Sequence, residues 1–332
     1  MRQVAVLAGV SPAAVSLALA GRPGVSAGTR ERVRAAAAEL GRLPARGGST
    51  VRETAIGLVL TRPAGQLGLE PFYMEFVSGI QSVLAERGAW LLLRLVADRA
   101  QETAVHRAWW RARRVAGSVL VDLTEDDPRL PALAALGMPV VAAGRPGPAD
   151  PGTTAVWTDD AAAIEEAVRY LAVLGHRRIA RVGGDPALGH TVLRTRALAR
   201  VTAELGLEPA RSLATDYSAQ AGARATRILL AGAHRPTAIV YDNDIMAVAA
   251  LAVAAEFGLR VPQDLSLIAW DDSQLCRLTH PTLSAMSHDV PGYGAQVAGR
   301  LFDLIERRPA PSGPAPTPVL VPRGSSAPPG AV

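Results

Sequence analysis

Residues 4–19 read VAVLAGVSPAAVSLAL, and this stretch decides the architecture of the N-terminal part of the chain. Gly9 stands where two short helices would turn, since a residue without a Cβ enters the left-handed backbone region at the least cost. Ser11 is a favourable N-cap, and Pro12 suits the first helical position because the N–H that it lacks has no partner there. Val15 would fill the angle between the helices. The pattern predicts a helix-turn-helix whose second helix begins with its first turn facing outward.

A third helix is predicted directly after this motif. Ser26 is a suitable cap, and Gly41 a suitable end. The apolar residues between them recur at helical spacing: Val33, Ala36, Ala37 and Leu40. Three helices of this size form a small module that is only marginally stable alone.

The net charge of the chain is concentrated in the same segment. Residues 1–54 hold eight arginines and three glutamates, which accounts for the whole formal net charge of +5. A basic head on a neutral body is what binding to the phosphate backbone of DNA requires. A helix that begins at an exposed cap is the element that enters a major groove. The alternative is that the charged face only solvates a small helical domain.

Composition narrows the possible classes of protein. The chain has 332 residues, 49% of them hydrophobic, which is enough for a small head and one large or two medium domains. Every basic residue is arginine, which excludes a phosphate-loop lysine and a lysine Schiff base. Cys276 is the only cysteine, which excludes an intrachain disulfide and fits a reducing compartment. The chain opens without a signal-peptide pattern, and the longest apolar run, residues 245–255, is too short to span a bilayer, so we expect a cytoplasmic protein without a membrane partner.

Strand-like and helix-like patterns alternate after residue 55. The strand-like runs are residues 56–60, 90–95, 118–122, 139–143, 179–183, 238–241 and 265–270. The helical patterns cover residues 72–87, 100–113, 160–174, 191–205, 219–232, 245–257 and 291–308. Almost continuously apolar strands between helices predict an α/β fold with parallel sheets covered on both faces. Two such units are expected in series, meeting near residues 144–160.

The C-terminal segment after Arg308 is rich in proline, and most of it is predicted to be disordered. Within it, residues 318–321 are the candidate for a final edge strand. Residues 320–325, LVPRGS, match a protease site used in protein engineering, which we interpret as coincidence. The expected domains are therefore a helix-turn-helix head (1–46), a hinge or linker (47–55), a two-lobed core (56–327) and a flexible tail (328–332).

With these motifs in this order, the chain resembles the LacI/GalR family of transcriptional regulators over nearly its whole length. The motifs are Val4-Ala-x-x-Ala8-Gly-Val-Ser11, Pro23-Gly-Val-Ser26, Thr29-Arg-Glu-Arg-Val33, Ile56-Gly-Leu-Val, Leu174-Gly-His-Arg-Arg-Ile179, Asn243-Asp244, Val261-Pro, Asp264-Leu-Ser-Leu-Ile268, Asp271-Asp272 and Pro281-x-Leu283. The resemblance implies a DNA-binding head, a hinge, and a core like a periplasmic sugar-binding protein. It also implies a homodimeric repressor that binds a near-palindromic double-stranded DNA operator. A small effector, most often a sugar or related polyol, would change the affinity of the repressor for this DNA.

The resemblance assigns phosphate contacts in the head to Ser11, Ser16 and Thr29, with Arg22 and Arg46 as further candidates. Ser11 and Ser16 have the alternative of only capping or solvating helices. Arg22 and Arg46 have the alternative of being ordinary surface arginines.

The base-facing positions in the head are Pro12, Ala13 and Leu17, and they depart from the family pattern. The family often has arginine at the position of Leu17, and none of these three side chains forms hydrogen bonds. Direct readout is therefore expected to rest on apolar contact with thymine methyl groups. Gly48 stands where the family places a leucine that wedges into the minor groove, which argues against a strong kink.

In the core, the resemblance points to seven effector-binding residues: Phe72, Tyr73, Arg194, Tyr217, Asn243, Asp271 and His288. An aromatic face packs against a sugar ring, while arginine, asparagine and aspartate provide directional donors and acceptors. Asp271 directly follows a buried strand, where a carboxylate needs a partner. Alternatively, Phe72 is a residue of the hydrophobic core, and His288 is a surface histidine that contacts no ligand.

Two other functions share parts of this pattern. A solute-binding protein of a transport system would have the same two-lobed core, with a secretory signal and without a basic head. An enzyme on a doubly wound fold would need a catalytic constellation, and neither G-x-S-x-G nor G-x-G-x-x-G occurs. The six histidines show no metal-ligand spacing, so we expect no enzyme activity, no metal and no cofactor.

Overall fold

The computed structural model describes residues 2–19, 24–39, 54–62, 70–148, 150 and 152–330. The chain divides into two compact units, Met1–Glu53 and Thr54–Val332, which we call the head and the core. Within the described residues, no helix combines the length and the apolar character needed to cross a bilayer.

The head consists of α1 (Arg2–Ala8), α2 (Pro12–Leu19) and α3 (Ala27–Glu39). The predicted turn and caps are confirmed. Gly9 has a φ of 63°, the amide of Ala14 donates to Ser11 Oγ at 3.2 Å, and the amide of Thr29 donates to Ser26 Oγ at 3.2 Å. The buried residues of the head are Val4, Ala5, Ala8, Val15, Ala18, Val33, Ala36 and Ala37. Arg22, Leu40, Gly41, Arg46 and Gly48 lie outside the described residues.

The first lobe of the core, the N-lobe, is built on a six-stranded sheet in the order β11-β5-β4-β3-β1-β2, with every pair parallel. Its strands are β1 (Ala55–Thr61), β2 (Trp90–Val96), β3 (Gly117–Leu120), β4 (Val140–Ala143), β5 (Ala155–Trp157) and β11 (Gly313–Pro314). Helices α4 (Pro71–Arg87) and α12 (Val290–Ile305) cover one face, and α5 (Arg99–Arg111) and α6 (Arg129–Ala134) the other. Successive residues of β1 point to opposite faces of the sheet. Leu58 packs against α4 and Val59 packs against α5.

The second lobe, the C-lobe, repeats this plan with the strand order β12-β10-β9-β8-β6-β7. Its strands are β6 (Ile179–Gly183), β7 (Arg211–Ala214), β8 (Ala238–Tyr241), β9 (Ser266–Trp270), β10 (Ser284–Ser287) and β12 (Val319–Val321), and only the β10–β12 pair is antiparallel. Helices α7 (Asp160–Val173) and α8 (Gly189–Glu204) cover one face, and α9 (Ala219–Leu230) and α10 (Asp244–Glu256) the other. The short α11 (Gln274–Leu278) precedes β10.

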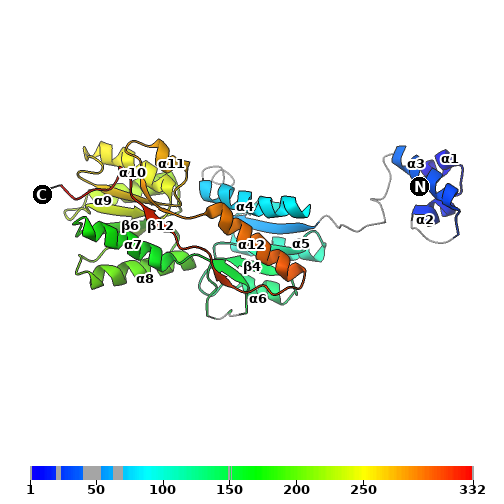
Figure 1. Ribbon diagram of the computed structural model, residues 1–332, viewed down its shortest axis with the longest axis horizontal. Helices are drawn as coiled ribbons and strands as arrows, with labels where there is room; N and C mark the ends of the chain where they lie inside the picture. Colours follow the sequence, from blue (N-terminus) through cyan, green and yellow to red (C-terminus); the bar gives the residue numbers. More distant parts are fainter. Residues whose placement is uncertain are drawn as a thin grey trace. The chain divides into compact units, whose positions relative to one another are not determined.

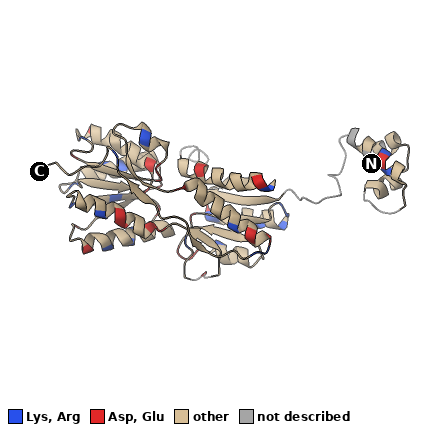
Figure 2. Cartoon of the chain, in the orientation of Figure 1, with Lys and Arg blue, Asp and Glu red and all other residues tan. Residues whose placement is uncertain are grey.

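The two lobes exchange segments of the chain. The backbone passes between them after β5, after β10, and again between β11 and β12 (Figure 1). Basic and acidic residues are interspersed on the helices of both lobes, in keeping with the neutral charge of this part of the sequence (Figure 2).

Helices α4 and α12 lie side by side and approach closely because each carries a glycine at the contact (Figure 1). A Cβ on Gly79 would lie 1.8 Å from the carbonyl oxygen of Pro291, and one on Gly294 would lie 2.2 Å from that of Phe76. This packing fixes the start of α4, where aromatic residues follow Pro71.

The predicted α/β class and parallel sheets are confirmed, but four short strands were not predicted, one of which, β11, has only two residues. Strand β10 reads Ser-Ala-Met-Ser and has no β-branched residue, although three of its four residues are buried. Strand β7 is an exposed edge, and β5 has only three residues. Such segments carry neither alternation nor a long apolar run.

The prediction of disorder after Arg308 is wrong. The expected edge strand is present as β12, and the residues that follow it pack along the C-lobe. Ser325 is fully buried and its Oγ donates to the carbonyl of Leu267 at 2.6 Å. The packing continues into the segment expected to be a flexible tail, since the amide of Gly330 donates to the carbonyl of Gln263 at 3.0 Å.

Candidate functional site

The N-terminus of α2 is exposed on the surface of the head. Ser11, Pro12, Ala13 and Ser16 are all exposed, as a reading helix requires. Leu17 is half-buried and lies over Gly24, where an added Cβ would be 3.6 Å from Leu17 Cδ1. Thr29 is also half-buried, and its hydroxyl accepts a hydrogen bond from Ser26 Oγ at 2.9 Å.

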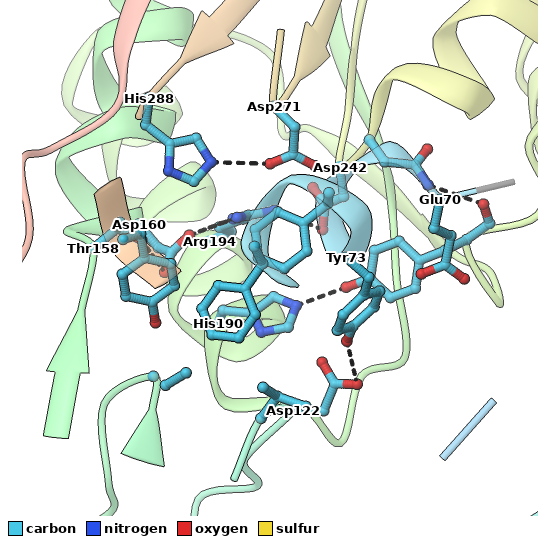
Figure 3. A pocket seen from close by; sticks show the side chains of 18 of the residues that line it. Glu70, Tyr73, Asp122, Thr158, Asp160, His190, Arg194, Asp242, Asp271 and His288 are labelled. Carbon is cyan, nitrogen blue, oxygen red and sulfur yellow. Dashed lines mark hydrogen bonds and ion pairs between the residues drawn. The ribbon is translucent and has the colours of Figure 1, made fainter. Parts of the chain in front are cut away.

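All seven residues predicted for the effector site line one cleft between the lobes. Figure 3 labels four of them, Tyr73, Arg194, Asp271 and His288. Phe72 and Tyr73 come from the first turn of α4 in the N-lobe. The others come from the C-lobe: Arg194 on α8, Tyr217 after β7, Asn243 at the cap of α10, Asp271 after β9 and His288 after β10. The carboxyl ends of the parallel strands in both sheets therefore face the same cleft.

An aromatic surface forms one part of the cleft. The ring of Phe72 stacks on Phe76 with centroids 6.0 Å apart and on the imidazole of His288 at 6.3 Å, while Tyr73 meets it edge-on at 5.3 Å. Phe72 also packs against the N-lobe core, so it is both a core residue and a lining residue. The alternative of a surface histidine for His288 is wrong, because its side chain is only 5% exposed.

On the C-lobe side, Arg194 is fixed by two carboxylates and an indole. Its Nε donates to Asp160 Oδ1 at 2.8 Å, its NH1 lies 3.6 Å from Asp242 Oδ2, and its guanidinium lies 3.8 Å from the ring centroid of Trp270. Burial lowers the pKa of Arg194, but Asp160 and Asp242 more than offset this and hold it above its usual value. The guanidinium is thus a permanent, pre-oriented cation.

Behind Arg194, Asp242 also binds Arg181, which is fully buried in the middle of β6. Nε of Arg181 donates to Asp242 Oδ1 at 2.7 Å, and its NH2 pairs with Oδ2. Burial raises the pKa of Asp242, but Arg181 and Arg194 outweigh it, and the pKa stays below its usual value. The arginine of the cleft is therefore anchored in a charged network inside the lobe.

On the N-lobe side, Arg62 occupies a similar position at the end of β1. It pairs with Asp122 at 3.0 Å and with Glu70 at 3.3 Å, and its NH2 donates to the hydroxyl of Tyr73 at 3.2 Å. That hydroxyl in turn donates to Asp122 Oδ2 at 2.7 Å. Burial raises the pKa of Asp122, but the charge of Arg62 is the main opposing cause and the pKa stays below its usual value, so the carboxylate is ionised.

Tyr217 is held in place by its backbone and by polar contacts. Its φ is 66°, and its ring lies over Gly184, where a Cβ would be 1.8 Å from the ring. The hydroxyl of Tyr217 lies 2.7 Å from His190 Nε2, and its carbonyl accepts from Asn243 Nδ2 at 2.9 Å. Because Asn243 Oδ1 also caps α10 by accepting from the Met246 amide at 3.0 Å, Asn243 positions the site as well as lining it.

Asp271 faces the cleft from a left-handed backbone with a φ of 77°. One carboxylate oxygen lies 3.1 Å from His288 Nε2, as Figure 3 shows. Among the described residues, none hydrogen-bonds to its second oxygen, Oδ2. Nearby Asp244 is buried, and burial is the main cause that raises its pKa to about 6.

Sequence reasoning missed five lining residues that organise the cleft: Arg62, Asp122, Asp160, His190 and Asp242. Asp242 follows the buried strand 238–241, and the same position directly after a buried strand supported the assignment of Asp271. Arg181 also gave a signal, since a charged residue inside an apolar strand needs a partner. His190 lies in the first turn of a helix and gave none. Burial, followed by the charge of Arg194, lowers the pKa of His190, so its imidazole is neutral at pH 7.

Comparisons with known proteins agree with this architecture. Residues 1–44 match the model for bacterial regulatory proteins of the lacI family, and residues 168–326 match a periplasmic binding protein-like domain. The HTH-type transcriptional regulator CelR of Thermobifida fusca is 31% identical over 311 residues, covering 92% of this chain and 91% of that protein.

Two solved structures are similar over almost the whole chain. A complex of the transcriptional regulator CelR with cellobiose superposes with a TM-score of 0.73 at 29% identity, covering 97% of this chain and 98% of that one. The lac repressor dimer bound to operator and the anti-inducer ONPF gives a TM-score of 0.77 at 28% identity, covering 98% of each chain. This chain belongs to the lacI family of bacterial regulatory proteins. It is a DNA-binding transcription regulator and not an enzyme.

Proposed function

We propose that this regulator binds a near-palindromic operator as a homodimer and that a small neutral sugar in the interlobe cleft alters its affinity for DNA, most simply as a repressor. The observation that carries the proposal is the convergence of side chains from both lobes on one cleft. A ligand that contacts both walls favours the closed arrangement of the lobes.

The charges of the cleft favour a neutral ligand. Its lining holds six carboxylates, at Glu70, Asp122, Asp160, Asp242, Asp244 and Asp271, against three guanidinium groups, at Arg62, Arg145 and Arg194. Arg62 and Arg194 are each already paired with two of these carboxylates. An anionic ligand such as a sugar phosphate would meet a surplus of negative charge, whereas hydroxyl groups can donate to carboxylates and accept from arginine. A structurally similar relative was solved with cellobiose.

The head supplies the DNA-binding part of the proposal. Ser11 and Ser16 are exposed at and near the N-terminus of α2, where hydroxyl groups and backbone amides suit phosphate oxygens. Pro12, Ala13 and Leu17 offer apolar contact but no hydrogen bonds to bases, so we expect strong salt dependence and modest sequence discrimination.

The core also offers a surface for a second copy of the chain. Strand β2 is an edge of the N-lobe sheet, and it exposes Trp90 (61% exposed) and Leu93. Met74 on the neighbouring α4 is exposed as well. An exposed edge strand is a template for pairing with another chain, and exposed apolar patches mark interaction surfaces. The lac repressor dimer has the same fold.

Gel shift and thermal shift with charge variants test the proposal. The DNA is the region upstream of the protein's own coding sequence, and the sugars are glucose, galactose, fructose, cellobiose, maltose, lactose, trehalose and sucrose. We expect Ser16→Glu to weaken DNA binding about tenfold or more, because it places a carboxylate against phosphate, and to leave the sugar-induced rise in melting temperature unchanged. Ala203→Glu, which adds the same charge to an exposed position of α8, should bind DNA like wild type. Unaltered DNA binding by Ser16→Glu would refute the placement of the DNA contacts. The absence of any sugar-induced stabilisation would refute the effector.

A further inference from the structure

Backbone contacts join the two lobes at a place where the chain does not cross between them. The crossings follow β5 and β10 and lie between β11 and β12. Elsewhere in the sequence, the amide of Gly189 donates to the carbonyl of Leu123 at 2.8 Å, and Leu188 forms an antiparallel β-bridge with Thr124. The start of α8 in the C-lobe is therefore attached to the loop that follows β3 in the N-lobe.

An ion pair between the same two segments reinforces this attachment. On α8, Arg196 NH1 donates to Glu125 Oε1 at 2.8 Å and NH2 donates to Oε2 at 3.3 Å. Two parallel contacts of this kind fix the orientation of both groups. The side chains are 66% and 50% exposed, so the pair adds little to the stability of the fold. It lies between two lobes that can move, and there a small free energy is enough to shift an equilibrium.

The N-lobe half of the attachment is held firmly in its own lobe. The amide of Thr124 donates to Asp127 Oδ2 at 3.1 Å, and that carboxylate pairs with the buried Arg129 at 2.6 Å. The backbone at Glu125 packs directly on Gly147, where a Cβ would lie 1.6 Å from the carbonyl oxygen of Glu125. The loop therefore moves with the N-lobe and not independently of it.

The C-lobe half belongs to the helix that carries the arginine of the cleft. Leu188 is the N-cap residue of α8, is only 3% exposed, and precedes Arg194 by less than two turns. Leu123 and Gly189 both line the main cavity, whereas Glu125 and Arg196 do not. The attachment thus forms part of the boundary of the cleft, and separating it would move one wall away from the other.

We propose that Leu123, Glu125, Gly189 and Arg196 form a latch that favours the closed arrangement of the lobes before any ligand binds. A ligand that contacts both walls binds the closed arrangement, so its apparent affinity is reduced when fewer molecules are closed. The latch itself is independent of the ligand, and only this effect on affinity rests on the proposed function.

The separation of the lobes is measured without any sugar. Asp126→Cys in the N-lobe and Ala199→Cys on α8 place spin labels at exposed positions, and Cys276→Ala removes the native thiol from the full-length protein. Double electron–electron resonance then gives the distribution of distances between the labels. We expect Arg196→Glu to shift this distribution to longer distances, because two carboxylates then face each other. The double variant Glu125→Arg and Arg196→Glu recreates the pair and should restore the original distribution.

The matched control reverses a charge within one lobe. Arg227 pairs with Glu256 at 2.9 Å on the surface of the C-lobe, and the two side chains are 48% and 50% exposed. Arg227→Glu therefore breaks an ion pair of similar exposure that does not join the lobes, and the distance distribution should stay as in the wild type.

The backbone contact has its own test. Gly189 is the first residue of α8, and Leu188 before it is extended, with φ −75° and ψ 133°, so a proline at position 189 suits the helix. Gly189→Pro removes the N–H that donates to Leu123 and should lengthen the distances. Gly189→Ala keeps this N–H, and its Cβ would lie 3.4 Å from the carbonyl oxygen of Leu123, an ordinary contact, so it should retain the distances of the wild type.

Calorimetry with the eight sugars of the thermal-shift panel measures the effect on affinity. For any sugar that binds the wild type, we expect Arg196→Glu to lower the affinity about threefold to tenfold. The double variant should recover it to within about twofold. Because Glu125 and Arg196 lie outside the main cavity, a loss that the exchange of charges reverses comes from the lobes and not from a lost ligand contact.

The outcomes separate the latch from the proposed effector. Unchanged distances in both Arg196→Glu and Gly189→Pro would overturn the latch, whatever the sugars do. Longer distances in Arg227→Glu as well would show a general loosening of the C-lobe and would also overturn it. Longer distances in the two latch variants alone support the latch, and if no sugar of the panel then binds, only the proposed effector is wrong.

Discussion

Each wall of the cleft contains an arginine paired with two carboxylates, but the two arginines differ in how deeply they are buried. Arg62 in the N-lobe and Arg194 in the C-lobe each lie between two carboxylates. The N-lobe arginine is 15% exposed, and beyond its carboxylates it contacts a tyrosine hydroxyl, whereas Arg194 is 9% exposed and continues through Asp242 to the fully buried Arg181. The difference shows that breaking two similar ion pairs can lower the free energy of unfolding by very different amounts. The loss is larger where an unpaired charge remains buried.

The largest expected effect is on stability. Asp242→Ala leaves Arg181 buried without a carboxylate, and we expect the free energy of unfolding to fall by about 3–5 kcal/mol. Asp122→Ala, the matched change in the N-lobe, leaves Arg62 with Glu70 and partial access to water, so a loss of about 1–2 kcal/mol is expected. Urea denaturation of both variants measures the difference. Equal losses would mean that the two walls are energetically alike.

The next effect is on the ligand. Arg194→Ala removes a guanidinium that Trp270 and Asp160 hold in one orientation, and we expect the best-binding sugar to lose about 1–3 kcal/mol of affinity. Arg62→Ala should cost less, because this more exposed arginine is oriented by fewer buried groups. Calorimetry with both variants decides. A greater loss for Arg62→Ala would place the main ligand contact in the N-lobe.

The smallest effect is a dependence of stability on pH that both walls influence. Burial and then Arg194 lower the pKa of His190 below its ordinary value of 6.5, although Asp122 opposes this from the other lobe. As the pH falls below 6.5, the unfolded chain takes up a proton that the folded chain excludes, so stability decreases, by at most about 1.4 kcal/mol per pH unit. His190→Gln should lose less stability than wild type on acidification from about pH 7.5 to about pH 5, as measured by thermal melting. Parallel curves for the two proteins would show that His190 is not held neutral.

Much of this architecture follows from local patterns. Gly9, Ser11 and Pro12 specify the turn and cap of the head within a few residues, and the apolar runs of β6 and β8 are long enough to predict with the bounds observed. The seven effector residues came from the family resemblance, and the structure brings them to one cleft.

The remaining features depend on contacts between distant parts of the sequence. The contact of His190 with Tyr217, which follows the neighbouring strand β7, exists only once the C-lobe sheet has formed. The C-terminal segment has a composition typical of disorder, yet Ser325 finds backbone partners on β9, 58 residues earlier in the sequence. Composition cannot predict such pairing, because the partners exist only once the C-lobe sheet has formed.

That C-terminal segment also gives the C-lobe a peptide bond whose cleavage by a protease depends on local unfolding. Arg323 inserts its guanidinium between Asp272 and the carbonyl of Leu283, and the amide of Gly324 points to Thr282. A protease that cleaves after arginine must take that side chain into its own pocket and hold the flanking residues extended, which the folded C-lobe forbids. The Arg323–Gly324 bond can therefore be cleaved only when this segment separates from β10. The cleavage rate consequently measures local unfolding at this edge of the C-lobe.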